Sequence, residues 1–314
     1  MSTQYTCHTN HWHSTDRRRS VSAILALAIC GLTPTAGYAY TAAGDRNFPA
    51  NLILPQVAPS DAIWIPFSTQ PFDAAKMADP TRETSFTGTY SKTITERLGI
   101  QFSDGLARED RLGTSSLTGA QNFDVLLQYE TILDPSHEAV LSVQVEHNFG
   151  QTGDKNLNSY QQSFTQPAVT FAKGFGDLPI GYWRPLAITG FTGYQIGEGG
   201  PNKVNAGFSV QYSMPYLVSK VANIDLPPFL RGMTPMVEVL YSAPAGPSRG
   251  GSQTLEVAPG VSYSRGRGWE LAIEATIPTN KATGSGLGVI AQVVIQLDYL
   301  LPDSVFGRPL FSPR

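Results

Sequence analysis

Apolar and polar residues alternate regularly in a long stretch near the end of the chain. In its first arm, Trp269 to Ile277, every second residue is apolar, and Glu270 and Glu274 fall between them. In its second arm, Val289 to Tyr299, the same period continues with Asp298 on the polar row. Successive side chains of a strand point to opposite faces, so a period of two predicts two adjacent β-strands.

Each arm is about ten residues long, which is about the length that a tilted strand needs to cross a bilayer. Aromatic residues stand near the ends, at Trp269 and Tyr299, where a membrane-interface girdle would place them. A soluble sandwich would bury the apolar row, whereas a barrel in lipid would turn it outward and leave the carboxylates in a wet lumen. These two strands alone do not separate the two folds.

Segments of the same kind recur from residue 84 onward, joined by alternately short and long connections. The further segments are 85–93, 97–103, 122–132, 138–149, 160–175, 185–196, 204–214, 235–242 and 255–263. Their polar rows hold mainly Gln, Ser, Thr, Asn and isolated acids, whereas a water-exposed sandwich face more often carries Lys and Glu. The pattern therefore predicts an all-β fold, an antiparallel up-and-down transmembrane β-barrel.

About eleven segments are visible, and bacterial barrels have even strand numbers. We expect ten to twelve strands, and twelve if the apolar island at 62–67 or a missed strand joins the sheet. Closure would also remove the exposed edges that an open sheet of this length would have.

Three regions follow from this pattern. Residues 1–39 are predicted to be a signal peptide, with a basic stretch at Arg17 to Arg19, an apolar core at 21–32 and cleavage after Ala39. Residues 40–82 are predicted to be a periplasmic N-terminal segment, in which a short strand or a lumen plug at Ile63 to Phe67 is open. Residues 83–314 are predicted to form the barrel.

Composition narrows the function classes. Charged residues are only 15% of the chain, against roughly 25% in soluble domains. The formal net charge of −3 offers no basic field, so we expect no nucleic-acid partner. Both cysteines, Cys7 and Cys30, fall inside the predicted signal peptide, which leaves no disulfide or thiolate metal site afterwards.

Three stretches carry a resemblance to a known family. They are NFDVLLQYETILDPSHEAVLSVQVEHNF at 122–149, GFGDLPIGYWRPLAITGFTGYQIG at 174–197 and LLPDSVFGRPLF at 300–311. In them the chain resembles the outer-membrane proteins of the MetA-pathway-of-phenol-degradation group. The resemblance implies an outer-membrane β-barrel that transports aromatic or other hydrophobic compounds, and it implies no catalytic residue. The chain departs from the usual barrel ending, because residues 301–314 continue past the last predicted strand.

If the apolar rows face lipid, the carboxylates of the other rows point into the lumen. The predicted lumen-lining residues are Asp124, Glu130, Glu146, Glu238, Glu256, Glu270, Glu274 and Asp298. Few basic residues share these rows: Arg97 is one, and Lys173 is open to either face. The lumen would therefore favour cations over anions, as acidic rings do in channels. Alternatively, the acids pair locally or only solvate the interior.

Catalytic chemistry has little support in the sequence. The two histidines after the signal peptide, His137 and His147, are isolated, and Ser115 and Ser116 lack a G-x-S-x-G setting. No phosphate loop, dinucleotide fingerprint or zinc motif is visible. We therefore expect no enzyme activity, no cofactor and no metal site.

The sequence thus predicts a small-molecule channel or transporter in the outer membrane of a Gram-negative bacterium. Its expected partners are outer-membrane lipid, the outer-membrane assembly machinery and a small-molecule solute. Family resemblance favours a hydrophobic or aromatic solute, whereas the polar rows favour a polar solute or cation. The alternatives are a periplasmic or surface β-sandwich that binds a ligand without forming a pore, and a membrane-embedded hydrolase.

Overall fold

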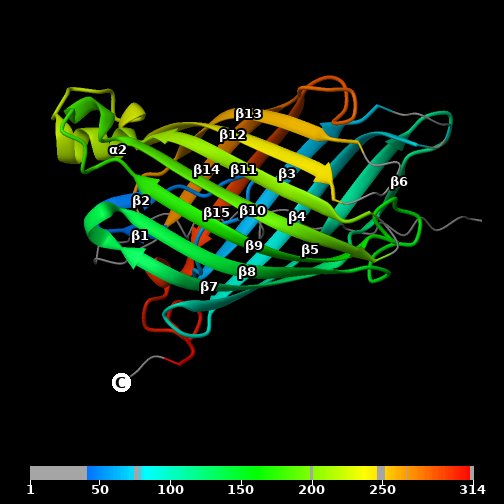
Figure 1. The fold of residues 1–314 in the computed structure, drawn as a ribbon, viewed down its shortest axis with the longest axis horizontal. Coiled ribbons are helices and arrows are strands. Elements are labelled where there is room, and N and C mark those ends of the chain that lie inside the picture. Colours follow the sequence, from blue (N-terminus) through cyan, green and yellow to red (C-terminus); the bar gives the residue numbers. More distant parts are fainter. Residues whose placement is uncertain are drawn as a thin grey trace, which may run out of the picture. The chain divides into compact units, whose positions relative to one another are not determined.

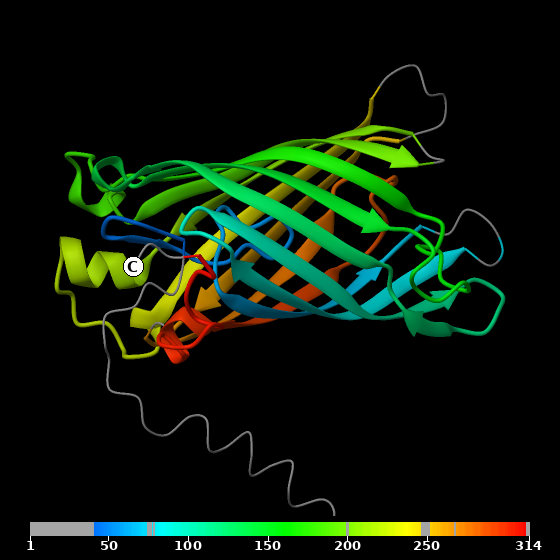
Figure 2. The ribbon, with the colours of Figure 1, turned by 90° about the horizontal axis from the view of Figure 1, so that it is seen from below.

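The computed structural model describes residues 41–73, 77, 79–198, 201–245, 252–266 and 268–311. In this part of the chain, twelve antiparallel strands close into a barrel, and neighbours in the sequence are neighbours in the sheet (Figure 1 and Figure 2). The barrel strands are β3 (Ala62–Pro71), β4 (Pro80–Thr93), β5 (Leu98–Arg111), β7 (Phe123–Asp134), β8 (Ala139–Phe149), β9 (Ser163–Gly174), β10 (Leu186–Glu198), β11 (Lys203–Tyr212), β12 (Met233–Pro244), β13 (Thr254–Tyr263), β14 (Trp269–Pro278) and β15 (Gly288–Gln296). The predicted up-and-down barrel with twelve strands is confirmed, and the open sandwich is excluded.

The barrel is closed by β15 and β3, which pair over eight residues from Gln296↔Ala62 to Val289↔Thr69. The first barrel strand therefore lies inside the region predicted as the N-terminal segment, and so does the start of β4. The boundary predicted at residue 83 is wrong for this reason. The apolar island that was left open as a plug or a strand is a barrel strand, in which Trp64 faces the lumen side and is buried.

Burial along the strands is the reverse of that in a soluble protein. Apolar side chains such as Phe86 and Ile273 are 53% and 51% exposed, whereas Ser142, Thr170 and Ser209 on the other row are fully buried. An outward apolar face is stable only where lipid covers it, and an inward polar face only where water or polar groups meet it. Among the described residues, no helix is long and apolar enough to span a bilayer.

The two ends of the barrel differ. One end, called the plug end below, carries β1 (Thr41–Ala43), β2 (Arg46–Phe48) and the short helical turns. These turns are η1 (Pro135–His137), η2 (Gly181–Trp183), α2 (Met214–Tyr216), η3 (Leu217–Val221), η4 (Leu230–Gly232) and α3 (Leu297–Leu300). The opposite end, called the loop end, carries the longer connection 150–162 and β6 (Leu117–Ala120), which pairs with the end of β5.

The last strand is shorter than predicted. It ends at Gln296, and the chain turns into α3, where the Leu297 amide donates to the Asp61 carbonyl (2.8 Å). The tail then continues along the plug end, where the Phe311 amide donates to the Ile94 carbonyl (2.9 Å). Asp298 is therefore on α3 and not on a strand of the lumen wall.

The predicted signal peptide and its cleavage site lie outside the described residues.

Candidate solute channel and its plug

Residues 41–61, called the plug below, fold back into the plug end of the barrel before β3 begins. Apolar plug residues pack against small and apolar residues of the inner wall. The three buried clusters join Ala43, Phe48, Val57 and Ala58 to Val140, Ala172 and Ala187; Leu54 to Ala168 and Phe191; and Ala50 to Ala62, Trp64 and Val294. Burial of apolar area in these clusters favours the inserted plug over a free N-terminal segment.

The central plug contact is made by Glu238 of β12, whose side chain is fully buried. One carboxylate oxygen accepts from the Leu52 amide (3.1 Å), and the other accepts from the amides of Ile53 (2.8 Å) and Leu54 (3.1 Å). The plug has no sheet partner at this bend, so its amides need other acceptors. Because a buried backbone amide left without an acceptor costs free energy, these three hydrogen bonds hold the bend of the plug in the lumen.

Further wall residues bind the plug backbone on both sides of this bend. Glu270 of β14 accepts from the Ala50 amide (3.3 Å) and from the Ser262 hydroxyl. On the opposite wall, Gln128 donates to the Gln56 carbonyl (2.9 Å), and Thr170 donates to the Val57 carbonyl (3.0 Å). The plug is therefore attached to strands from opposite sides of the barrel.

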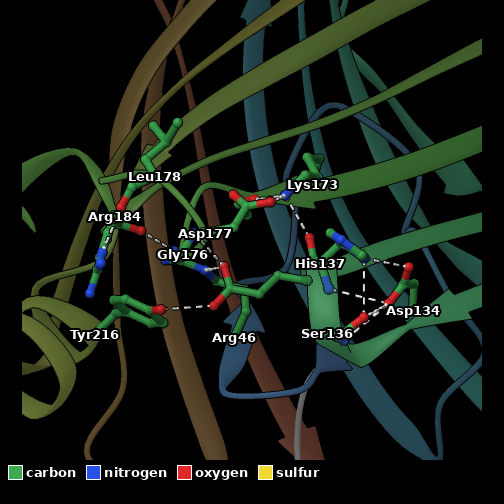
Figure 3. Close-up of polar contacts among 12 residues, drawn as sticks. Arg46, Asp134, Ser136, His137, Lys173, Gly176, Asp177, Leu178, Arg184 and Tyr216 are labelled. Atoms are coloured by element: carbon green, nitrogen blue, oxygen red, sulfur yellow. Dashed lines mark hydrogen bonds and ion pairs between the residues drawn. The ribbon is translucent and has the colours of Figure 1, made fainter. Parts of the chain in front are cut away.

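A buried ion pair fixes the hairpin of β1 and β2 at the plug end (Figure 3). The Arg46 guanidinium donates to Glu138 (3.1 Å) and to the backbone carbonyls of Arg184 and Pro185, and it stacks over the Tyr216 ring at 3.8 Å. The Tyr216 hydroxyl donates to the other Glu138 oxygen (2.8 Å). Burial, with the hydrogen bond to Glu138, raises the pKa of Tyr216 to about 12, so this phenol stays protonated.

Glu138 supports this contact through its backbone geometry. It lies in the turn between β7 and β8 with a positive φ of 50°, and its side chain also accepts from the Gly176 amide (3.0 Å). A non-glycine residue in the left-handed region is uncommon and is kept where its surroundings require it. The turn thus aims one carboxylate at Arg46, Tyr216 and Gly176 together.

Above the plug, on the loop-end side, the lumen contains a cavity of about 700 Å³, called the outer cavity below. Residues 51–56 of the plug form its floor, and its walls come from strands all around the barrel. The lining includes many amide side chains, the carboxylates Asp104, Asp124 and Glu146, and the aromatic residues Trp64, Phe164 and Phe191. No lysine or arginine is among the described residues of the lining.

A second cavity of about 520 Å³ lies at the plug end, between the β1–β2 hairpin, α2 and the turn after β13. Its lining includes Arg231 and Arg265 as well as Asp45. Plug residue Pro49 borders this cavity and Asn51 borders the outer cavity, so the plug lies between the two. The route through the barrel is therefore interrupted at residues 49–51.

The eight predicted lumen carboxylates divide by what they contact. Asp124 and Glu146 line the outer cavity, whereas Glu238 and Glu270 hold the plug. The other strand residues, Glu130, Glu256 and Glu274, stand on the same inward rows but do not line that cavity. Asp298 lies on α3, where burial raises its pKa to about 7. Whether these acids select solutes stays a prediction.

Glu274 is buried, and neither of its carboxylate oxygens has a hydrogen-bond partner in the described part of the chain. Gly260 faces it on β13, where an added Cβ would come within 2.3 Å of the Glu274 Cγ. The glycine makes room for this side chain.

Among the described residues, no three His, Cys, Asp or Glu side chains come together as a metal site.

The isolated histidine predicted beside a turn has polar neighbours. The Nδ1 atom of His137 contacts both the Asp134 carboxylate (2.8 Å) and the Ser136 hydroxyl (3.1 Å) (Figure 3). Asp134 also caps the turn, because its carboxylate accepts from the backbone amides of Ser136 and His137. In a Ser-His-Asp triad the serine and the carboxylate contact opposite nitrogens of the imidazole. This arrangement is therefore a capped turn and not a proton relay.

Sequence reasoning considered a lumen plug only at Ile63 to Phe67 and missed both the plug at 41–61 and the wall residues that bind it. Arg46 lies in a segment with little periodicity, and Asn51, Gln128 and Thr170 are ordinary polar residues of a wall or loop. One signal was available in the last strand, where Ile290 and Val294 interrupt the polar row. Both are buried on the lumen side, and Val294 packs against plug residue Ala50.

No protein-family model and no curated protein matches the chain. Among solved structures, the COG4313 outer membrane channel from Pseudomonas putida F1 is similar, with a TM-score of 0.52, 12% identity, and 80% of this chain and 99% of that chain covered. KdgM porin aligns with a TM-score of 0.47 and 11% identity over 75% of this chain and 98% of its own. Outer membrane phospholipase A from Escherichia coli aligns with a TM-score of 0.38 and 11% identity over 79% and 93%.

At these identities the likeness concerns the fold alone, and the two TM-scores below 0.5 bear no functional weight. The chain has the fold of an outer-membrane β-barrel and is similar in architecture to a solved channel. The specific resemblance to the phenol-degradation group stays a prediction, because no family model matches.

Proposed function

We propose that this protein is an outer-membrane channel for small molecules whose lumen is closed by its own N-terminal plug. The observation that carries the proposal is the division of the lumen, in which a polar outer cavity of about 700 Å³ ends on plug residues 51–56. Those residues are attached to the wall by carboxylates and amides and can leave it without unfolding a barrel strand.

The plug end faces the periplasm in this proposal. The described chain enters the barrel there through residues 41–48, and the tail at 301–311 lies at the same end. A preceding export signal would bring the chain to the membrane from the periplasmic side. The longer loop 150–162 and the outer cavity then face the cell exterior.

The solute class remains divided between two expectations. The resemblance to the phenol-degradation group favours aromatic or hydrophobic compounds, whereas amides and carboxylates in the outer cavity favour polar solutes and cations. We favour a polar solute, since each buried amide of the wall offers a hydrogen bond that a hydrocarbon would leave unmade.

Planar-bilayer recording with purified protein tests the channel. Wild type is compared with a variant that lacks residues 41–57 but keeps Asp61, which receives hydrogen bonds from Lys92 and Thr93. We expect the deletion to raise single-channel conductance several-fold, because it joins the two cavities. Heat-modifiable gel mobility of both proteins is the folding control. Equal conductance from two folded proteins would contradict the plugged-channel proposal.

A further inference from the structure

The outer cavity contains two carboxylates in mutual contact. Asp124 on β7 pairs across the sheet with Asn148, and Glu146 on β8 pairs with Leu126, so the two acids are diagonal neighbours on the lumen side. Their carboxyl groups lie within hydrogen-bonding reach of each other. Two carboxylates at this separation repel each other unless a positive group or a proton lies with them.

The side chains around this pair are oriented toward it. Asn122 donates to Asn148 (3.5 Å), which in turn donates to Asp124 (3.3 Å). On the other side, Gln166 donates to Glu146 (3.2 Å). Each carboxylate thus receives a hydrogen bond from a neighbouring amide, and among the described residues neither forms an ion pair with a lysine or arginine.

Asn205 extends the second arm of this network by donating to the Gln166 carbonyl oxygen. Because that oxygen is already engaged, the Gln166 amide nitrogen is turned toward Glu146. The amides are therefore held in place before any solute enters, which lowers the ordering cost of binding.

A second feature of the cavity also points to a ligand. Trp64 lines the outer cavity, is 5% exposed, and its indole Nε1 has no hydrogen-bond partner in the described part of the chain. The nitrogen itself is covered, so a solute in the outer cavity meets the indole ring, which suits a nearby cation.

Resting on the proposed channel function, we propose that the outer cavity is a binding site for a small organic amine. Its ammonium group sits at Asp124 and Glu146, and its polar body contacts the surrounding amides and Trp64. An inorganic ion alone fits less well, because the cavity volume far exceeds one ion and no third acid joins the pair to complete a metal site among the described residues.

Isothermal titration calorimetry on the detergent-solubilised protein tests this site without requiring transport. The probe is putrescine, and 1,4-butanediol and succinate serve as neutral and anionic analogues of similar length. We expect saturable putrescine binding and at least tenfold weaker binding of both analogues. Equal binding of putrescine and butanediol, or no putrescine binding, would overturn the amine site while leaving the conductance test of the channel unaffected.

Two variants locate the site. Asp124→Asn combined with Glu146→Gln keeps the shape of both side chains and should weaken putrescine binding at least tenfold. Glu256→Gln is the matched control, since this acid is on the inward row of β13 but does not line the outer cavity. If Glu256→Gln weakens binding as much as the double variant, the acids attract the amine only through the total negative charge of the lumen and not at a defined site, and the proposal is wrong.

Gln166→Lys provides an independent check if the double variant folds poorly. This lysine would place its own ammonium beside Glu146, where Gln166 now donates, and should compete with putrescine without removing either acid. Undiminished putrescine binding in folded Gln166→Lys protein would also overturn the proposal. Saturable calcium binding at the pair with no putrescine binding would replace the organic amine by a metal ion.

Discussion

The two halves of the lumen have the same wall but different contents. In the plug-end half, inward positions include small residues such as Ala172 and Ala187, and the plug fills the space with its own apolar side chains. In the loop-end half, inward positions include many amides and acids, such as Gln166 and Glu146, and a cavity remains.

Carboxylates show the difference most clearly. Glu238 in the plug-end half accepts hydrogen bonds from three backbone amides of the plug, whereas Glu146 in the loop-end half meets another acid and one amide side chain. The same residue type on the same kind of row is structural in one half and available to solute in the other. What decides its role is the chain segment that reaches it.

The strongest test of this contrast is Glu238→Ala. Three plug amides lose their acceptor, and an unsatisfied buried donor costs about 1–3 kcal/mol, so we expect plug release to rise by about 100-fold or more. A reporter cysteine at Leu54, which is buried beside Phe191, measures release by its thiol-labelling rate. Glu256→Ala with the same reporter is the control and should label at the parent rate.

The second largest effect is expected for Arg46→Ala, which should destabilise the β1–β2 hairpin. Removing one partner of a buried ion pair costs about 3–5 kcal/mol, because it leaves the other charge unpaired. Here Tyr216 and Gly176 still bind Glu138 and soften the loss. Limited proteolysis of folded protein should cut near residue 46 faster in Arg46→Ala. Adding Glu138→Gln should restore part of the protection, and if it worsens cleavage the ion pair is not the cause.

Charge in the loop-end half should affect selectivity and not closure. In the variant without residues 41–57, Asp124→Asn with Glu146→Gln should lower the potassium-to-chloride permeability ratio about twofold or more, because acidic groups favour cations in a pore. Reversal potentials under a salt gradient measure the ratio. An unchanged ratio with unchanged conductance would mean that these two acids do not act on permeating ions.

The smallest expected effect concerns Asp298, outside the lumen wall. Burial, with a further contribution from Asp61, raises its pKa to about 7 from an ordinary 3.8. The folded state therefore holds the proton more tightly than the unfolded state, and stability is lost as pH rises from about 4 through 7. Asp298→Asn should gain about 1 kcal/mol at pH 8 and almost nothing at pH 4, with partial solvent exposure reducing the shift.

Urea titrations of heat-modifiable mobility at pH 4 and pH 8 compare the two proteins. A gain that is equal at both pH values would show that removal of charge is not the reason. Neither result alters the difference between the lumen halves, since Asp298 lies on α3, after the last strand of the wall.

Much of the wall could be predicted because strand alternation is local. Along β14 the outward Ile273 and the inward Glu274 alternate as the sequence suggests, and the same holds for Val143 and Gln144 on β8. Strand ends were harder, since β15 stops at Gln296 only because the chain turns to bind Asp61. The alternation also placed Glu238 and Glu270 on the inward rows, but it did not indicate that both bind the plug backbone.

By itself, the sequence determined the fold class and the lipid-facing rows of the strands, because both depend on neighbours two residues apart, whereas the even strand number came from the general rule for bacterial barrels. Tertiary structure alone decided that residues 41–61 enter the lumen, that Arg46 reaches Glu138 and that Asp124 meets Glu146. These contacts join residues far apart in the chain: 22 positions for Asp124 with Glu146, 186 for Leu52 with Glu238 and 220 for Ala50 with Glu270. Such pairings depend on how the barrel closes, and the alternation of polar and apolar residues along a strand carries no information about that closure.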